Sequence, residues 1–323
     1  MPLLRAEAEK LSNDTLISGI ITEIIDRDDL FAVLPFTRVN SKAYVYNREN
    51  TLASASWLDP NDTVTESAST FTEVVAKLRI LIGDVDVDKF LMSTMGDTND
   101  QLAIQIAQKA KGMGREFSKV LIQGASSDTT KEFDGVAKLV TSAQTISAGN
   151  SALNFAMLDE LLDKVPLGAD AIFMRRDTIR AYRQLLRATS GTDAVMQMLP
   201  QFGHPVLVHQ GIPILMNEFI PAEADGTCAI YAVRLNESDG LHGLYGGDKA
   251  GFSVEDIGTV QNKDAVRTRL KWYCGLALKS TRSLACLKGV KTSATQYGIG
   301  VTVNNASEIG GSSSSGSNTP SSP

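Results

Sequence analysis

The stretch from Asp97 to Ile122 constrains the fold of this chain most, because its apolar residues recur at spacings of three and four. Such spacing places them along one side of a helix, while charged residues such as Lys109 and Glu116 take much of the remaining circumference. The sequence therefore predicts a helix over 97–122, which at 1.5 Å per residue is about 39 Å long. Its apolar side consists of Leu102, Ile106, Ala110, Met113, Phe117, Val120 and Leu121.

Two glycines lie inside this predicted helix and a third follows it. Gly124 follows the last periodic residue, where a backbone in the left-handed region is expected to end the helix. Gly112 and Gly114 lie inside it, and each costs about 1 kcal/mol relative to alanine. We therefore expect a bend at these two positions or a close contact with another backbone.

Size and composition limit the classes of protein that the chain can be. Its 323 residues, 43% hydrophobic and 21% charged, can form two compact units or one elongated unit with extensions. The net charge of −6 argues against a protein that mainly binds nucleic acid, because phosphate binding needs clustered lysines and arginines. The sequence contains no run of about eighteen apolar residues and no signal-peptide core in its first ten residues. We expect an intracellular protein without a membrane span.

The N-terminal quarter of the chain changes its periodicity. Apolar doublets four residues apart, between Leu16 and Ile25, predict a helix with one apolar face that needs a partner. From Val39 the period is two, and a second β-like run covers 70–82. The segment between these runs, 51–69, is rich in small and polar residues and carries a tryptophan. This pattern is compatible with a long two-stranded hairpin with a broad tip, but a surface loop is the interpretation that the residues alone favour.

The rest of the chain alternates between helices and strands. Helices are predicted within 153–165 and 176–186, and strands at 169–174, 205–209, 212–217 and 228–235. A glycine-rich turn region at 240–251 precedes the strongest strand pattern, which has basic residues on one face and Leu270 and Trp272 on the other. A partly buried strand is predicted to continue over 275–287, and the serine-rich segment beyond Val303 is predicted to be disordered.

The chain carries no motif for catalysis or metal binding. Its three cysteines lack paired spacing and fit buried, reduced thiols, and His204 and His209 point to opposite faces of an extended run. Asp84, Asp86 and Asp88 alternate in another extended run, where a solvated acidic face is favoured over a calcium site because the calcium-loop pattern is missing. We therefore expect no cofactor, no metal and no enzymatic activity.

The order of these parts resembles the major capsid protein of tailed bacteriophages, which has the Hong Kong 97 fold. The likeness rests on Gln123-Gly124-Ala125, Glu132-Phe133-Asp134-Gly135-Val136, Ala171-Ile172-Phe173-Met174, Arg176-Asp177-Thr178 and Gly211-Ile212-Pro213-Ile214. It covers nearly the whole chain as ordered architecture. The resemblance implies an α+β fold with an N-arm, an extended β-hairpin loop, a long spine helix, and peripheral and axial domains.

By that resemblance the chain divides into six parts. They are an N-arm at 1–36, the extended loop with flanking strands at 37–82, a peripheral domain at 83–134 with its spine helix at 97–122, an axial domain at 135–256, returning peripheral strands at 257–303, and a disordered tail at 304–323.

The resemblance also implies a structural role. The chain is expected to assemble with copies of itself into hexamers and pentamers of an icosahedral shell, which packages double-stranded DNA in a virion assembled in the host cytoplasm. Portal, scaffolding or decoration proteins are the expected further partners, packaged DNA is expected to be contacted without sequence specificity, and no membrane is involved.

Two surfaces are expected to serve this role. Contacts between subunits are expected from the apolar N-arm face and the hairpin, at Leu16, Ile17, Ile20, Ile21, Ile24, Tyr44, Tyr46, Arg48, Trp57 and Leu58. The basic face of the last strand, with Arg267, Arg269 and Lys271, is expected to be either DNA-facing or ion-paired. The hairpin tip contains no lysine, so we expect a shell without covalent cross-links.

Two other functions are the alternatives. An encapsulin-type compartment shares the fold and encloses cargo enzymes instead of DNA. A soluble α+β enzyme would need a site assembled from scattered residues such as Asp134, Arg175 and His242.

Overall fold

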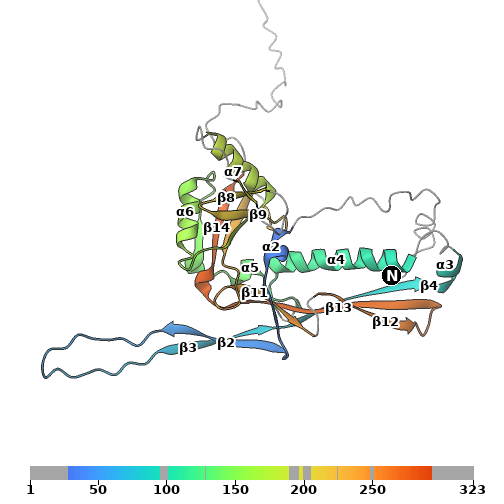
Figure 1. The fold of residues 1–323 in the computed structure, drawn as a ribbon, viewed down its shortest axis with the longest axis horizontal. Coiled ribbons are helices and arrows are strands. Elements are labelled where there is room, and N and C mark those ends of the chain that lie inside the picture. The colour runs from blue at the N-terminus through green and yellow to red at the C-terminus, as the bar shows by residue number, and fades with distance from the viewer. Residues whose placement is uncertain are drawn as a thin grey trace, which may run out of the picture.

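The computed structural model describes residues 28–94, 101–127, 129–188, 196–198, 205–223, 225–247 and 251–292. The predicted N-terminal helix, with Leu16, Ile17, Ile20, Ile21 and Ile24, and the predicted tail at 304–323 lie outside these residues. The described chain forms an elongated molecule in which one β-sheet stands upright, a second sheet lies flat beneath the longest helix, and a hairpin projects from one end (Figure 1).

One helix is much longer than the others, as predicted. The helices are α2 (Asp29–Val33), α3 (Lys89–Thr94), α4 (Gln101–Gln123), α5 (Val136–Leu139), α6 (Phe155–Asp163) and α7 (Arg176–Ala188). The apolar side of α4 faces inward as its periodicity predicts, with Met113, Phe117 and Leu121 buried. Leu102 and Ile106 pack against the same part of the core.

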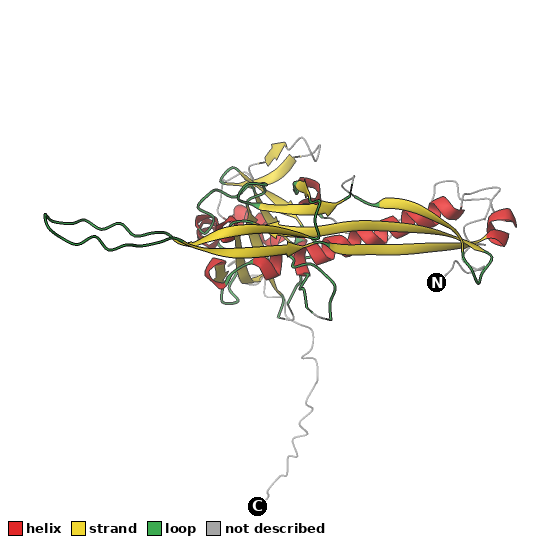
Figure 2. Ribbon diagram, turned by 90° about the horizontal axis from the view of Figure 1, so that it is seen from below, coloured by secondary structure: helices red, strands yellow, loops and turns green. Residues whose placement is uncertain are grey.

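The five-stranded sheet lies under α4. It consists of β1 (Phe36–Arg38), β4 (Arg79–Asp88), β11 (Leu241–Gly246), β12 (Ser253–Thr259) and β13 (Ala265–Leu278). The long strand β13 pairs with β4 along one edge and with β12 and then β11 along the other, all antiparallel. Figure 2 shows that α4 covers one face of these strands and that no helix of the described residues covers the opposite face.

Aromatic rings fill the space between α4 and this sheet. The Phe117 and Trp272 ring centroids are 4.4 Å apart, and the rings of Phe31 and Phe36 lie within 6.2 Å and 5.9 Å of the Trp272 centroid. Aromatic side chains bury large apolar areas and dominate the energetics of cores. This cluster therefore fixes α4 and the N-terminal segment on the sheet.

Glycine permits the close approach of α4 to β4. A side-chain carbon at Gly83 would lie 2.5 Å from Lys109 Cε and 2.9 Å from the Met113 sulfur, so the flexible ends of both side chains would have to shift to admit one. Gly112 and Gly114 behave differently, because a side-chain carbon at either would meet no atom of the described chain within 4 Å. The close backbone contact expected at these two glycines is absent from the described part of the chain.

The seven-stranded sheet forms the upright part. Its strand order is β5 (Thr145–Ser147), β14 (Leu284–Lys291), β10 (Thr227–Val233), β6 (Ala171–Met174), β9 (Ile212–Met216), β8 (Pro205–His209) and β7 (Met196–Met198). The strands predicted at 169–174, 205–209, 212–217 and 228–235 are confirmed as β6, β8, β9 and β10 to within two residues at each end. Leu158 and Leu161 of α6 and Tyr182 of α7 are buried with residues of this sheet in one core cluster.

The hairpin implied by the resemblance is also present. Strand β2 (Ala43–Thr51) pairs antiparallel with β3 (Thr70–Lys77), so the surface loop that the residues alone favoured is wrong. The β-like run at 70–82 is two strands, because Leu78 separates β3 from β4, and β4 pairs with β13 instead of β2.

The glycine-rich region at 240–251 was predicted as a turn and instead contains the buried strand β11. The glycines in this segment are typical of turns, so the strand was not predicted. The fold requires glycine at position 243, because a side-chain carbon there would collide with the Phe36 ring. His242 and Leu244 of this strand are fully buried.

The strand predicted to run over 275–287 is also two strands. A 3₁₀ turn at Thr281–Ser283 separates β13 from β14, which belongs to the other sheet. The sheets therefore divide the chain differently from the expected boundaries: β11 lies outside the sheet of its predicted axial domain (135–256), and β14 lies outside that of the predicted peripheral segment (257–303). Periodicity could not reveal these crossings, because strand alternation continues on both sides of the turn.

Two local predictions about chain ends need correction. Residues 28–36 were assigned to an N-arm, but Leu30 is fully buried, and β1 pairs in parallel with β11. Gly124 is outside the left-handed region. It is required for another reason, because a side-chain carbon there would collide with the carbonyl oxygens of Val120 and Phe133.

Candidate assembly surfaces

The base of the hairpin is fastened to its own chain. The Tyr46 hydroxyl donates a hydrogen bond to the Leu278 carbonyl oxygen at 2.7 Å, and Arg48 Nε donates to the Lys279 carbonyl oxygen at 2.6 Å. The Tyr44 ring meets the His242 ring edge-on, with centroids 5.7 Å apart. These three hairpin residues were predicted to contact another subunit, and that contact stays a prediction beside the internal role found here.

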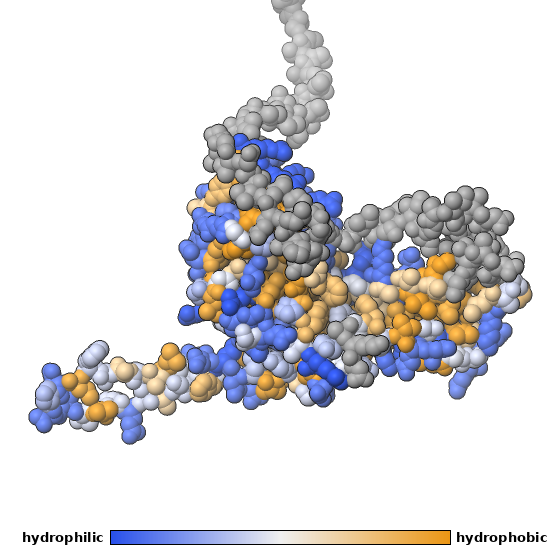
Figure 3. All heavy atoms as spheres, viewed as in Figure 1, coloured by the Kyte–Doolittle hydropathy of each residue, from blue (hydrophilic) through white to orange (hydrophobic). Residues whose placement is uncertain are grey.

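Within the described chain, the tip of the hairpin is exposed along almost its whole length. We define the tip as residues 52–69, and Trp57 within it is wholly exposed, at 103% of its reference area. The tip is shaped by its own polar groups: the Asp59 backbone N–H donates to the Asp62 carboxylate at 2.9 Å, and Asn61 has a positive φ of 79°. Figure 3 shows apolar side chains distributed along this projecting ribbon. A large aromatic side chain with no internal partner is typical of an interface anchor.

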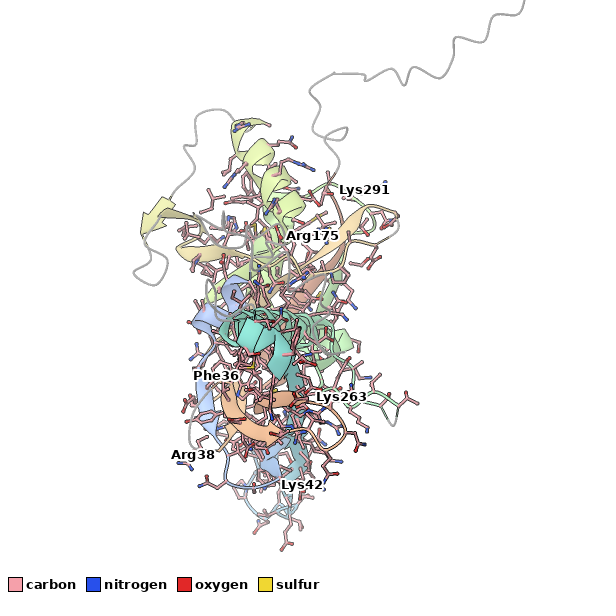
Figure 4. The ribbon with its side chains drawn as sticks, turned by 90° about the vertical axis from the view of Figure 1, so that its right-hand side faces the viewer. Phe36, Arg38, Lys42, Arg175, Lys263 and Lys291 are labelled. Atoms are coloured by element: carbon pink, nitrogen blue, oxygen red, sulfur yellow. The ribbon has the colours of Figure 1, made fainter. Side chains whose placement is uncertain are left out.

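A hollow of about 460 Å³ lies where the hairpin joins the five-stranded sheet. We call it the basal hollow, and its charged lining residues in the described chain are Arg38, Lys42 and Arg79. Ile80 and Tyr273 supply an apolar part of its wall, and both are exposed. Figure 4 shows Arg38 and Lys42 at the same end of the molecule, on the side of the sheet away from α4.

A larger hollow, of about 810 Å³, lies between β2 and the turn after β13. Its lining mixes both signs of charge, with Glu49 and Asp239 beside Lys279 and Arg282. The Arg48 side chain within it is already bonded to backbone carbonyl groups. Positive and negative side chains therefore partly compensate each other in this hollow, whereas the charged lining residues of the basal hollow in the described chain are all cationic.

The open face of the five-stranded sheet carries a ladder of ion pairs. Arg267 binds Asp86 through two hydrogen bonds of 2.6 and 2.7 Å, and Arg269 binds Asp84 through two of 2.8 and 2.9 Å. Lys271 donates to Glu255 at 2.6 Å. The predicted basic face, with Arg267, Arg269 and Lys271, is thus ion-paired.

The same pairs correct the interpretation of the acidic run. Asp84 and Asp86 were expected to form a solvated acidic face, but the hydrogen bonds from Arg269 and Arg267 hold the pKa of each carboxyl group below its ordinary value. The third carboxylate, of Asp88, accepts a hydrogen bond from the Phe90 backbone at the start of α3. Within the described residues, no group of three or more potential ligands is placed to hold a metal ion.

Known structures share this architecture. The chain superposes on the SrpI encapsulin of Synechococcus elongatus PCC 7942 with a TM-score of 0.70 and 22% sequence identity, over 91% of this chain and 98% of that one. It matches the capsid protein of a native GTA particle with a TM-score of 0.60 and 16% identity, over 86% and 96% of the two chains. It matches a protein of Microbacterium phage Oxtober96 with a TM-score of 0.61 and 14% identity, over 90% and 100%.

The chain has the Hong Kong 97 fold. This confirms the fold predicted from the order of its parts, with α4 as the spine helix and β2–β3 as the extended loop. Neither a protein-family model nor a curated protein matches the sequence. At these levels of identity, the structural likeness establishes the fold alone.

Within this Hong Kong 97 fold, the groups considered for a scattered enzyme site have structural partners. The Asp134 carboxylate accepts a hydrogen bond from the Ser126 backbone at 2.8 Å, and Arg175 donates to the Ile220 carbonyl oxygen at 3.0 Å. His242 is fully buried, and this burial lowers its pKa. These three groups thus have local structural roles in different parts of the fold.

The cysteines are buried free thiols, as predicted. Burial raises the pKa of Cys274 and of Cys286 to about 12 and also raises that of Cys228. Because the thiolate is the reactive form, these side chains are chemically quiet at neutral pH.

One basic surface of the molecule, on helix α7, was not predicted from the sequence. Helix α7 exposes an arginine at spacings of four, three and four, which is a helical signal that inspection of charges alone could have found. Two of these side chains have acidic partners, since Arg176 pairs with Glu218 at 2.5 Å and Arg180 with Asp177 at 3.3 Å. The four residues are Arg176, Arg180, Arg183 and Arg187.

None of the helices in the described part of the chain combines the length and hydrophobicity needed to cross a bilayer.

Proposed function

We propose that this chain is the major capsid protein of a tailed bacteriophage, which assembles with copies of itself into hexamers and pentamers of an icosahedral shell around double-stranded DNA. The observation that carries this proposal is the hairpin, whose tip stands clear of the body with Trp57 wholly exposed (Figure 1). A two-stranded ribbon is marginal by itself in water, so its tip is suited to lie against another subunit.

The proposed contacts between subunits involve the hairpin and the N-arm. Repetition around a ring lets modest contacts accumulate into a stable assembly. The proposed contact residues are Leu16, Ile17, Ile20, Ile21, Ile24, Tyr44, Tyr46, Arg48, Trp57 and Leu58. Portal, scaffolding or decoration proteins complete the proposed virion, assembly takes place in the host cytoplasm without a membrane, and the chain itself has no enzymatic role.

Encapsulin-type compartments are the second candidate, favoured by the superposition on the SrpI encapsulin. Both candidates predict closed particles, and they differ in what the particle encloses. Particles should therefore be purified from the organism or virus that carries the gene, treated with nuclease, and analysed for protected DNA and co-purifying proteins.

Each result of that experiment selects one reading. Long protected double-stranded DNA supports the capsid, and a stoichiometric enzyme cargo without DNA supports the compartment. A stable small monomer in size-exclusion chromatography, with no particles in negative-stain micrographs, contradicts both. Denaturing electrophoresis should show single subunits, since the tip has no lysine for a cross-link.

A further inference from the structure

Helix α7 carries a row of four exposed arginines, which we call the arginine stripe. They recur every three or four residues, so they share one side of the helix. The opposite side is buried on the seven-stranded sheet through Tyr182 and Leu186. Figure 3 shows hydrophilic side chains at the top of the upright part, where α7 lies in Figure 1. The members of the stripe are Arg176, Arg180, Arg183 and Arg187.

The positive charge of the arginine stripe is only partly compensated. The side chains of Arg176 and Arg180 are paired with carboxylates but remain 67% and 65% exposed. Ion pairs of this kind contribute about 0–1 kcal/mol, so these two cations can exchange their partner for another anion at little cost. Arg183 and Arg187 form no ion pair with any other described residue.

The dimensions and chemistry of the stripe fit a row of phosphate groups. From Arg176 to Arg187 the helix rises about 16 Å at 1.5 Å per residue. A strand of double-stranded DNA carries one phosphate per about 3.4 Å of its axis, so the stripe spans about five phosphates of one strand. All four members are arginines, whose planar guanidinium group binds phosphate through paired hydrogen bonds. Contacts of this kind hold the backbone and read no sequence.

The burial of α7 argues against a lipid surface as the ligand. A helix that binds a bilayer inserts its apolar side among the lipids. Here that side is occupied by the core, because Tyr182 is 2% and Leu186 is 8% exposed. The remaining competitor for the stripe is an acidic protein segment.

We propose that the arginine stripe of α7 is the surface of this chain that contacts packaged double-stranded DNA, through its phosphate groups and without sequence specificity. This inference rests on the proposed function, since DNA is the polyanion that the proposed shell encloses. The stripe takes the place of the basic face of β13, whose cations are compensated by carboxylates of the same chain. It follows that α7 faces the interior of the shell.

The first test compares arginine reactivity in DNA-filled particles and in particles emptied of DNA. Phenylglyoxal modifies accessible arginines, and mass spectrometry of peptides measures the extent at each position. Arg183 and Arg187 should be modified several-fold less in filled particles, because phosphate groups cover them. Arg282, an exposed arginine outside the stripe, is the internal control and should be modified equally in both.

The second test removes the two arginines that have no partner in the described chain. Arg183→Gln with Arg187→Gln keeps residues that favour helix. Binding of a double-stranded oligonucleotide is measured against salt concentration, with the subunit below the concentration at which it assembles. Loss of two phosphate contacts should make the slope of log K against log salt concentration shallower by about 1.8, at about 0.9 per contact.

A matched variant controls for the change in net charge. Lys263→Gln with Lys288→Gln removes two cations at exposed sites outside α7 and should leave the salt slope as in wild type. Thermal unfolding shows whether each variant has kept its fold. If the arginine variant does not fold, the reactivity of the wild-type particles decides the question.

The outcomes distinguish the two levels of inference. If no particles form, or if they hold no double-stranded DNA, the proposed function fails and the inference fails with it. If DNA-filled particles exist but Arg183 and Arg187 react alike in filled and emptied ones, or if the folded arginine variant keeps the wild-type slope, α7 is not the DNA contact and the proposed function stands. Binding of polyglutamate but not of DNA would identify an acidic protein segment as the ligand and would also contradict the inference.

Discussion

The Arg267 guanidinium donates two hydrogen bonds, of 2.6 and 2.7 Å, to the carboxylate of Asp86, which lies 181 residues earlier in the chain. With the neighbouring pairs, Arg269–Asp84 and Lys271–Glu255, it places three cations against three carboxylates on the open face of the sheet. The charges of these three cations and three carboxylates thus cancel one another. The basic residues of β13 are thus compensated by acidic residues of the neighbouring strands β4 and β12.

Asp86→Asn should lower the free energy of unfolding at pH 7 by about 1 kcal/mol, because it removes a bidentate ion pair that is only partly exposed. The pKa of Asp86 in the folded chain lies below its ordinary value of 3.8. As the pH falls, Asp86 is therefore protonated in the unfolded chain before it is protonated in the folded chain. The stabilisation is therefore fully present above about pH 4 and is lost as the pH falls through the folded pKa.

Denaturant unfolding at pH 7 and at pH 3 measures this difference. Asp163→Asn, at an exposed position of α6, is the matched control and should have no effect at either pH. Equal stability of Asp86→Asn and wild type at pH 7 would show that the pair contributes nothing.

Two glycines of the spine helix, one inside it and one directly after its last residue, should respond in opposite ways to alanine. Gly112→Ala should raise the free energy of unfolding by about 0.5–1 kcal/mol, since alanine favours helix and the added carbon meets no atom of the described chain. Gly124→Ala should lower it by about 1–3 kcal/mol, because the added carbon would collide with the backbone carbonyl oxygens of Val120 and Phe133.

Thermal unfolding of both subunits tests this pair of signs. Particle assembly by Gly112→Ala tests the expected backbone contact separately. A more stable subunit that no longer assembles would indicate that a neighbouring copy approaches the helix at this glycine.

His242 should make the hairpin base sensitive to mild acid. Burial lowers the pKa of His242, with the Lys279 charge adding to the effect, so the unfolded chain binds the proton at a higher pH than the folded chain does. Stability attributable to this residue is present above about pH 6.5 and declines as the pH falls below it.

His242→Phe keeps an aromatic ring against Tyr44 and removes the titration. Between pH 7 and pH 5, the variant should lose less stability than wild type in denaturant unfolding. Parallel curves for the two proteins over this range would disprove the assignment.

Removal of the N-terminal segment should impair assembly more than folding, provided that the cut spares the buried part of α2. Residues from Asp28 onward belong to the body: the Asp28 carboxylate accepts a hydrogen bond from Asn217 at 2.7 Å, and Leu30 is fully buried. Deletion of residues 1–26 should thus give a folded subunit that forms few particles, as judged by thermal unfolding and negative-stain microscopy. Normal shells from this variant would refute the N-arm assignment.

Trp57→Ala should weaken particles and leave the melting temperature of the subunit unchanged, because the side chain has no contact area to lose within its own chain. Particle dissociation in urea is the measurement. Val64→Ala, at another exposed site of the same tip, is the control and should dissociate like wild type. Equal dissociation of all three proteins would remove Trp57 from the interface.

Local pattern determined much of this protein. The spacing of apolar residues within short segments was enough to predict helix α4 and strands β6, β8, β9 and β10. The period of this spacing decides which side of a helix or strand can be buried. The order of such elements was enough to indicate the Hong Kong 97 fold. The exposed tip of the hairpin also followed, because a small, polar segment between two strands cannot bury itself.

Whether a surface is neutral, buried or open depends on contacts between segments that are distant in the chain. Glycine masked β11, whose place in the sheet depends on the Phe36 ring, and an unbroken alternation hid the crossing from β13 to β14. The pairing of Arg267 with Asp86 and the gathering of Arg38, Lys42 and Arg79 around one hollow join segments far apart in the chain. The physical reason is that periodicity is a property of neighbouring residues, whereas charge compensation and steric fit depend on which distant strands the fold brings together.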